Sequence, residues 1–426
     1  MLLIKNSYII DPRFGIEGEK DILIKEGKIL RICECGSCND MTGVSEIVDA
    51  QGLIAAPGLI DVHVHFRDPG FTYKEDIESG SRSAAKGGFT TVVLMANTKP
   101  VVDNKETLAY VLEKGKQTGI RVESCCAVTK GLQGKELTDM SELMQAGAAG
   151  FTDDGIPLLE EEIVLQAMKK AAELGAVISF HEENPAYIQN NGINAGKAAV
   201  HYGIGGSDRR AEIDMVERDV RLAQQTGATV NIQHISSKEA VELVRQAKKT
   251  GAEIYAEATP HHFTLTEEAA IEYGTLAKMN PPLREEADRL AIIEGLKDGT
   301  IELIATDHAP HSREEKEKAI TEAPSGIIGL ETALSLGITS LVEPGHLTMK
   351  ELLGKMTWNP AKLYGLDRGY LAEGSGADMV LFDAKEKEVV EGFVSKSSNS
   401  PFAGTELTGV VKYTICDGKI VYRKNK

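Results

Sequence analysis

The sequence Asp-Val-His-Val-His-Phe-Arg, residues 61–67, places histidine at alternate positions within a β-rich run. In a β-strand, alternate side chains lie on the same face. We therefore expect His63, His65 and Arg67 to share one face. The other face would carry Val62, Val64 and Phe66. Two imidazoles about 7 Å apart along a strand can both reach one cation, so the pattern predicts a metal site at the end of this strand.

Seven further apolar runs follow the first, most of them before a helix-like segment such as 160–175 or 237–251. Eight strand–helix units over residues 56–365 predict an α/β protein with a (β/α)8 TIM barrel. An open doubly wound sheet is the alternative, but it gives no comparable reason for chemical residues at nearly every strand end. The eight runs span residues 59–66, 90–98, 121–128, 148–155, 176–184, 228–236, 253–262 and 301–310.

Both ends of the chain have a different pattern, with short β-rich runs between turn residues. These runs lie at 2–10, 21–30 and 46–50 near the N-terminus and at 377–384, 409–416 and 419–424 near the C-terminus. We expect residues 1–55 and 366–426 to form one small β-sandwich domain beside a catalytic barrel domain of residues 56–365.

The net charge of −17 argues against nucleic-acid binding, because phosphate recognition requires a basic surface. No apolar stretch of about 18 residues is present, and the first residues lack the layout of a signal peptide. We expect a cytoplasmic protein that binds neither a membrane nor nucleic acid.

The six cysteines are predicted to be free thiols, because disulfides are rare in cytoplasmic proteins. Cys33, Cys35 and Cys38 resemble a metal knuckle but lack a nearby fourth ligand, so a cluster of loop thiols is the favoured interpretation.

Later strand ends repeat the chemistry of the first. His181, His234 and Asp307 end the fifth, sixth and eighth runs, and Asp153 and Asp154 end the fourth. Catalytic residues of a barrel gather at the carboxyl ends of its strands. Four imidazoles and two carboxylates suit two cations such as zinc that share a bridging oxygen. Strand alternation alone does not choose between Asp153 and Asp154.

The other six histidines receive lesser roles. His201 and His346 are expected on helix or loop surface, and His261 or His262 behind the metal ligands. His308 should point away from the site, whereas His311 lies within reach of a bound substrate.

These motifs resemble the amidohydrolase superfamily, and within it the bacterial type I dihydroorotases. The resemblance covers essentially the whole chain, and HFRDPG, NPPLR and TDHAPHS are its most specific parts. It implies a zinc enzyme that reversibly cyclises N-carbamoyl-L-aspartate to L-dihydroorotate and water in pyrimidine biosynthesis. The matching motifs are DVHVHFRDPG, MANTKP, GFTDDG, SFHEEN, QHIS, KMNPPLR, TDHAPHS and PSGIIGLET.

The resemblance also assigns the metal ligands. It implies two zinc ions per subunit, bridged by Asp154 and a hydroxide where many relatives use a carboxylated lysine. Asp307 would also be the catalytic proton shuttle. One zinc would be held by His63, His65 and Asp307, and the other by His181 and His234.

Substrate contacts are implied in the same way. Arg67 would grip the α-carboxylate, as a guanidinium does in a bidentate pair. Two positions depart from the family pattern and are expected near the pocket: Ala96, where many relatives have proline, and Ser325, where some have phenylalanine. The complete expected substrate-binding set is His65, Arg67, Asn97, Asn280, His311, Ser325 and Gly326.

The expected partners are the small-molecule substrate, a second copy in a homodimer, and aspartate transcarbamoylase in a possible complex. Two other interpretations remain. The chain could be another cyclic amidase, such as a hydantoinase or allantoinase, which usually carries the bridging lysine. It could also be a non-catalytic scaffold, although such relatives lack the metal ligands that this sequence has.

Overall fold

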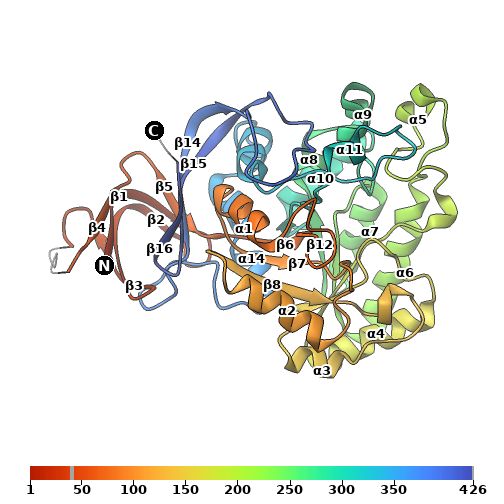
Figure 1. Ribbon diagram of the computed structural model, residues 1–426, viewed down its shortest axis with the longest axis horizontal. Helices are drawn as coiled ribbons and strands as arrows, with labels where there is room; N and C mark the ends of the chain where they lie inside the picture. Colours follow the sequence, from red (N-terminus) through yellow and green to blue (C-terminus); the bar gives the residue numbers. More distant parts are fainter. Residues whose placement is uncertain (39–42, 425–426) are drawn as a thin grey trace.

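The computed structural model describes residues 1–38 and 43–424, and its two sheets lie side by side (Figure 1). One sheet has eight neighbouring parallel strands, in the order of the sequence. The prediction of a (β/α)8 barrel is confirmed, and every predicted run contains a strand. The strands are β6 (Leu59–Val64), β7 (Phe89–Leu94), β8 (Arg121–Cys126), β9 (Gly150–Thr152), β10 (Val177–Phe180), β11 (Thr229–Ile232), β12 (Ile254–Ala258) and β13 (Leu303–Ile304).

Helices pack on the outside of the barrel strands (Figure 1). The two helix-like segments of the sequence form α4 (Glu161–Leu174) and α7 (Lys238–Lys249). Their apolar sides are buried, as an amphipathic helix against a sheet requires. The other helices of six residues or more are α1 (Ile77–Lys86), α2 (Lys105–Gly115), α3 (Met140–Gln145), α5 (Lys197–Tyr202), α6 (Arg210–Thr226), α9 (Glu268–Tyr273), α10 (Glu286–Asp298), α13 (Met349–Met356) and α14 (Trp358–Leu363).

The seam between β13 and β6 closes the barrel with a few specific bonds. Val64 and His308 form an isolated parallel bridge, and the His65 amide donates to the His308 carbonyl over 2.8 Å. Both carboxylate oxygens of the buried Asp61 accept from the Thr306 amide at 3.2 Å. The seam therefore holds the backbone that follows β13 directly beside the end of β6.

The side chains of β6 do not alternate regularly between the two faces of the strand. The prediction that Val62 shares a face with Val64 and Phe66 is therefore wrong. Val62 belongs to the apolar cluster that contains Val93 and Met95. Val64 and Phe66 belong to the larger cluster beneath the helices, as expected. The register of β6 against β7 shifts between Asp61 and Val64, and such an irregularity reverses the faces of the residues beyond it.

The second sheet unites both ends of the chain, as predicted. β14 pairs antiparallel with β5, so the C-terminal strands continue directly from the N-terminal ones. All its strands belong to one continuous mixed sheet, which has its own apolar core. The exact domain boundaries stay a prediction. The strands are β1 (Leu2–Asp11), β2 (Ile16–Lys25), β3 (Lys28–Glu34), β4 (Glu46–Asp49), β5 (Ile54–Pro57), β14 (Met379–Val389), β15 (Glu406–Cys416) and β16 (Lys419–Arg423).

The prediction of six free thiols is wrong for two of them. Cys33 and Cys38 form a disulfide, because the turn after β3 brings their Cα atoms to 5.8 Å, a separation that a disulfide can span. Cys35 is a free, exposed thiol, and the other three cysteines are free and buried.

Among the described residues, the helices are too short or too polar to cross a lipid bilayer.

Candidate metal centre

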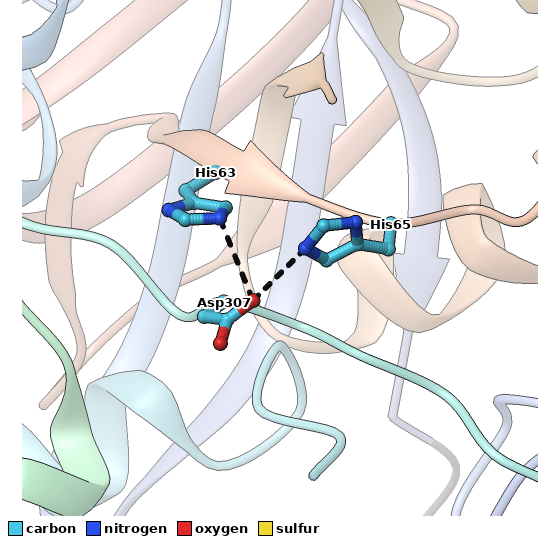
Figure 2. A group of neighbouring side chains, drawn as sticks. All are labelled: His63, His65 and Asp307. Carbon is cyan, nitrogen blue, oxygen red and sulfur yellow. Dashed lines mark hydrogen bonds and ion pairs between the residues drawn. The ribbon is translucent and has the colours of Figure 1, made fainter. Parts of the chain in front are cut away.

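The first-strand histidines and Asp307 meet at the carboxyl end of the barrel. Figure 2 shows both imidazoles at the end of β6 pointing toward the Asp307 carboxylate, which follows β13. One oxygen of Asp307 lies 3.0 Å from His65 Nε2 and 3.5 Å from His63 Nε2. All three residues are buried, so the barrel brings together the first group of predicted ligands.

Asp154 lies between this group and the later histidines. Its Oδ1 is 3.2 Å from His63 Nε2 and 3.6 Å from His181 Nδ1, and its Oδ2 is 3.5 Å from His65 Nε2. His181 Nδ1 and His234 Nε2 are 2.8 Å apart. The carboxylate of Asp154 thus faces both groups of imidazoles, as a bridging ligand must.

Asp153 has a different environment. One of its oxygens accepts from the Val128 and Thr129 amides, at 2.7 and 3.1 Å, and the other accepts from the Thr129 hydroxyl. These bonds tie it to the segment after β8. Of the two neighbouring acids, Asp154 is the one whose side chain contacts the histidines.

The arrangement of the nitrogen and oxygen atoms in this site suits metal binding better than hydrogen bonding among the side chains. His63 Nε2 and Asp154 Oδ1 are fully buried, yet neither has a hydrogen-bond partner among the described residues. Buried polar atoms almost always have a hydrogen-bond partner. Two such atoms that face each other without one therefore indicate a site for a bound metal ion. Two triads place their donor atoms within 4.8 Å of one another: His63, His65 and Asp307, and His63, Asp154 and His234.

Electrostatics in the site reflect crowded charges. Burial alone would lower the pKa of His63, but the carboxylates of Asp154, Glu257 and Asp307 raise it well above its usual value. Burial similarly opposes the charged form of Asp154, but His63 and His181 hold the pKa of its carboxyl well below the usual range. A cation bound among these groups would stabilise the carboxylates and compete with the protons on the imidazoles.

Three site residues have a left-handed backbone. The φ angles are 59° at Arg67, 32° at His234 and 48° at Asp307. This region is costly for residues other than glycine, and such conformations gather at functional sites. Strand alternation could not predict these positions, because each lies where the strand has already ended.

On the substrate side, Arg67 and His311 lie beside the ligands. The Arg67 Nε donates to the Pro310 carbonyl over 3.2 Å, and His311 Nε2 donates to the Ser325 carbonyl over 2.8 Å. Burial and the cations Arg67 and Lys74 lower the pKa of His311, so its imidazole is neutral. Lys74 Nζ lies 3.3 Å from His311 Nδ1 and adds a second cation to this side of the site.

The two expected asparagines differ in their contacts. Asn97 accepts from His65 Nδ1 at 3.0 Å and donates to an Asp154 carboxylate oxygen at 3.0 Å, so both ends of its amide contact predicted metal ligands. The Asn280 Oδ1 is buried without a partner in the described residues. Asn280 therefore has an acceptor free for a bound molecule, whereas Asn97 orients His65 and Asp154.

Ser325 and Gly326 lie next to the His311 imidazole. The Ser325 hydroxyl donates to Asn191 Oδ1 over 2.9 Å, and Gly326 has φ 127°, a conformation that favours glycine. Ala96 is fully buried in the core between strands and helices. Of the two departures from the family pattern, Ser325 is the one that contacts a predicted substrate-binding residue, His311.

The remaining histidines are placed largely as expected. His261 and His262 are buried behind the site, His201 is exposed, and His346 is partly exposed. His308 packs against the Phe66 ring and accepts from the Gly329 amide, away from the other imidazoles.

Sequence reasoning missed three charged residues at the site, Glu183, Glu257 and Lys74. Glu257 is an acid within the apolar seventh run, which was the available signal. Its side chain is fully buried and touches His63.

Comparison with known proteins agrees with this geometry. The model of the amidohydrolase family matches residues 54–421. A dihydroorotase of Clostridioides difficile (strain 630) is 58% identical over 422 residues, covering 99% of this chain and 100% of the relative. A dihydroorotase of Clostridium acetobutylicum is 54% identical, with 99% of each chain covered.

Solved structures show the same fold at lower identity. The L-hydantoinase of Arthrobacter aurescens superposes with a TM-score of 0.87 at 27% identity, over 100% of this chain and 96% of that one. Full-length identity above 50% to the dihydroorotases outweighs this more distant likeness. The chain belongs to the amidohydrolase family, within its dihydroorotase branch.

Proposed function

We propose that this protein catalyses the reversible cyclisation of N-carbamoyl-L-aspartate to L-dihydroorotate and water, as a step in pyrimidine biosynthesis. The single observation that carries the proposal is the meeting of four imidazoles with Asp154 and Asp307 in one buried site. The names of the full-length relatives supply the substrate.

The residues present fit two zinc ions. His63, His65 and Asp307 would hold one, His181 and His234 the other, and Asp154 would bridge them. Bound zinc would supply Lewis-acid activation of the ring carbonyl and of the attacking water. This chain differs from relatives that bridge the metals with a carboxylated lysine, because it has aspartate at the end of β9.

Asp307 is the proposed proton carrier. In ring opening, its carboxylate takes a proton from the attacking water and delivers it to the leaving ring nitrogen as the carbon–nitrogen bond breaks. In ring closure the same oxygen moves the proton in the opposite direction. Its position, 3.0 Å from His65 Nε2, keeps it at the centre of the ligand cluster.

The substrate is held by groups on the open side of the cluster. Arg67 binds the α-carboxylate and Asn280 offers an amide to the ureido edge, with His311, Ser325 and Gly326 beside them. Ring closure removes one carboxylate charge and consumes a proton, so a lower pH should favour the ring. A ring fraction that rises with pH at equilibrium would contradict this proton balance.

A related cyclic amidase is the principal alternative, since the hydantoinases share the fold. Initial rates on dihydroorotate, hydantoin and allantoin, measured on one sample, separate the possibilities. The proposal predicts clear preference for dihydroorotate, and a chain that favours hydantoin or allantoin would overturn it. The homodimer, the association with aspartate transcarbamoylase and the cytoplasmic location stay predictions from the sequence.

A further inference from the structure

Two buried carboxylates lie behind the imidazoles, on the side away from the centre of the site. Glu257 Oε2 is 3.0 Å from His63 Nδ1, and Glu183 Oε2 is 3.3 Å from His181 Nε2. Both acids are almost completely buried. Each therefore contacts the ring nitrogen that does not face Asp154.

Such a contact decides which nitrogen of a neutral imidazole carries the proton. An ionised carboxylate only accepts hydrogen bonds, so the nitrogen that faces it must donate. The lone pair is then left on His63 Nε2 and on His181 Nδ1. These are the atoms that lie 3.2 and 3.6 Å from Asp154 Oδ1, in the predicted metal site.

Glu257 is itself held in place from within the barrel. Asn231 Nδ2 donates to Glu257 Oε1 over 2.5 Å and lies 3.3 Å from the Ser179 hydroxyl. That hydroxyl is 3.0 Å from the Tyr364 hydroxyl, at the other end of a buried polar chain. Because both oxygens of Glu257 are engaged, its carboxylate cannot turn away from His63 without breaking a buried hydrogen bond.

Within the described part of the chain, the other two imidazoles have no carboxylate at this position. His65 Nδ1 faces the neutral amide oxygen of Asn97, and His234 Nδ1 has no hydrogen-bond partner among the described residues. Each predicted set of zinc ligands thus contains one histidine backed by an acid, His63 in the first and His181 in the second.

We propose that Glu257 and Glu183 are positioning residues, each of which selects the metal-binding nitrogen of one histidine and strengthens one of the two metal positions. This inference rests on the proposed metal pair but not on the identity of the substrate. Outer partners of this kind orient the ligand and raise its basicity, and their loss typically weakens metal binding by about 10- to 100-fold.

The test measures zinc affinity in Glu257→Gln and Glu183→Gln by competition with a chelator. Glutamine keeps the volume but presents one acceptor and two donors. In Glu257→Gln it cannot accept from both His63 and Asn231. We expect one of the two zinc ions to bind about 10- to 100-fold more weakly in each variant. Wild-type affinity for both ions in folded variants would overturn the proposal.

Glu267→Gln is the matched control. Glu267 is similarly buried and accepts from Asn194 Nδ2 at 3.0 Å, but none of its hydrogen bonds in the described structure involves a site histidine. The proposal expects this control to bind both zinc ions normally. Equal weakening in the control would show that loss of any buried carboxylate has the same effect, and would also overturn it.

A second measurement uses the unmodified, zinc-loaded chain, in case the variants fail to fold. Nuclear magnetic resonance of 15N-labelled histidine should show a proton on His63 Nδ1 and on His181 Nε2. Protons on the opposite nitrogens would refute the inference. A wild-type chain that binds no zinc would instead remove the proposed function as well.

Discussion

The Asp307 carboxylate contacts both β6 imidazoles while its backbone holds a left-handed conformation. The orientation of its side chain thus depends on the backbone after β13, on the barrel seam and on the neighbouring histidines. Among the other predicted ligands, Asp154 is distinguished from Asp153 only by which way each side chain turns. The sequence could not make this choice, because both residues lie at the end of one strand.

Asp307→Asn tests the proton carrier. Asparagine keeps an oxygen that can face the metal but cannot take up a proton at working pH. We expect kcat to fall by about 100- to 10,000-fold, the usual contribution of a general acid–base group, while zinc content is largely retained. Asp153→Asn is a useful control, since Asp153 bonds to loop groups and should affect stability more than turnover. A nearly normal rate in Asp307→Asn would remove Asp307 from the proton path.

Arg67→Met tests recognition of the α-carboxylate. Loss of a charged hydrogen-bonding partner worth about 1.5–3 kcal/mol predicts a KM raised about 10- to 150-fold. Zinc content should stay unchanged, because the hydrogen bonds of Arg67 in the described structure involve Pro310 and His311 and none of the predicted ligands. Arg67→Lys keeps the positive charge but loses the two-pronged guanidinium, so its KM should lie between those of the wild type and Arg67→Met. If Arg67→Met loses zinc, Arg67 has a structural role instead.

At the scale of elements, the strand ends were predictable and their local geometry was not. Apolar, β-rich runs of eight to ten residues identified every barrel strand, because a barrel strand buried on both sides needs apolar residues. The misplaced Val62 shows the limit: a register shift in β6 leaves no mark in the hydrophobic pattern. Glu257 was missed because its partner His63 is 194 residues away in the chain.

The short helix α8 (Pro260–Thr264) carries a pH-sensitive contact to the segment with Asn280. His262 Nε2 donates to the Pro281 carbonyl over 3.0 Å, and its Nδ1 accepts from the Thr259 hydroxyl over 2.8 Å. Burial lowers the pKa of His262 to about 4. The imidazole is therefore neutral in the folded protein, whereas an unfolded histidine takes up a proton below a pH of about 6.5.

This difference has a definite sign. Because the folded pKa is the lower one, the stabilisation is complete above pH 6.5 and is lost as the pH falls to about 4, by about 3 kcal/mol in all. His262→Gln keeps a donor and an acceptor but does not titrate. Urea unfolding at pH 7 and pH 5 should give a smaller loss of stability in the variant. An equal loss in both proteins would contradict the lowered pKa of His262.

At the scale of the whole molecule, composition and periodicity predicted the barrel and the union of both chain ends. They could not show that the terminal strands form one continuous sheet, which depends on the pairing of β5 with β14 across more than 300 residues. The Cys33–Cys38 disulfide was missed for a related reason. The expected cytoplasmic compartment predicts free thiols, whereas the turn after β3 sets the separation of these two cysteines.

The central claim is that four histidines and two aspartates from separate strand ends share a pair of metal ions that activate an amide-type bond. The most direct test measures zinc content and the rate of dihydroorotate ring opening on the same purified sample, before and after chelation. The account predicts two zinc ions per chain, with turnover that disappears on chelation and returns with zinc. Turnover of dihydroorotate that persists in a fully metal-free sample would contradict it.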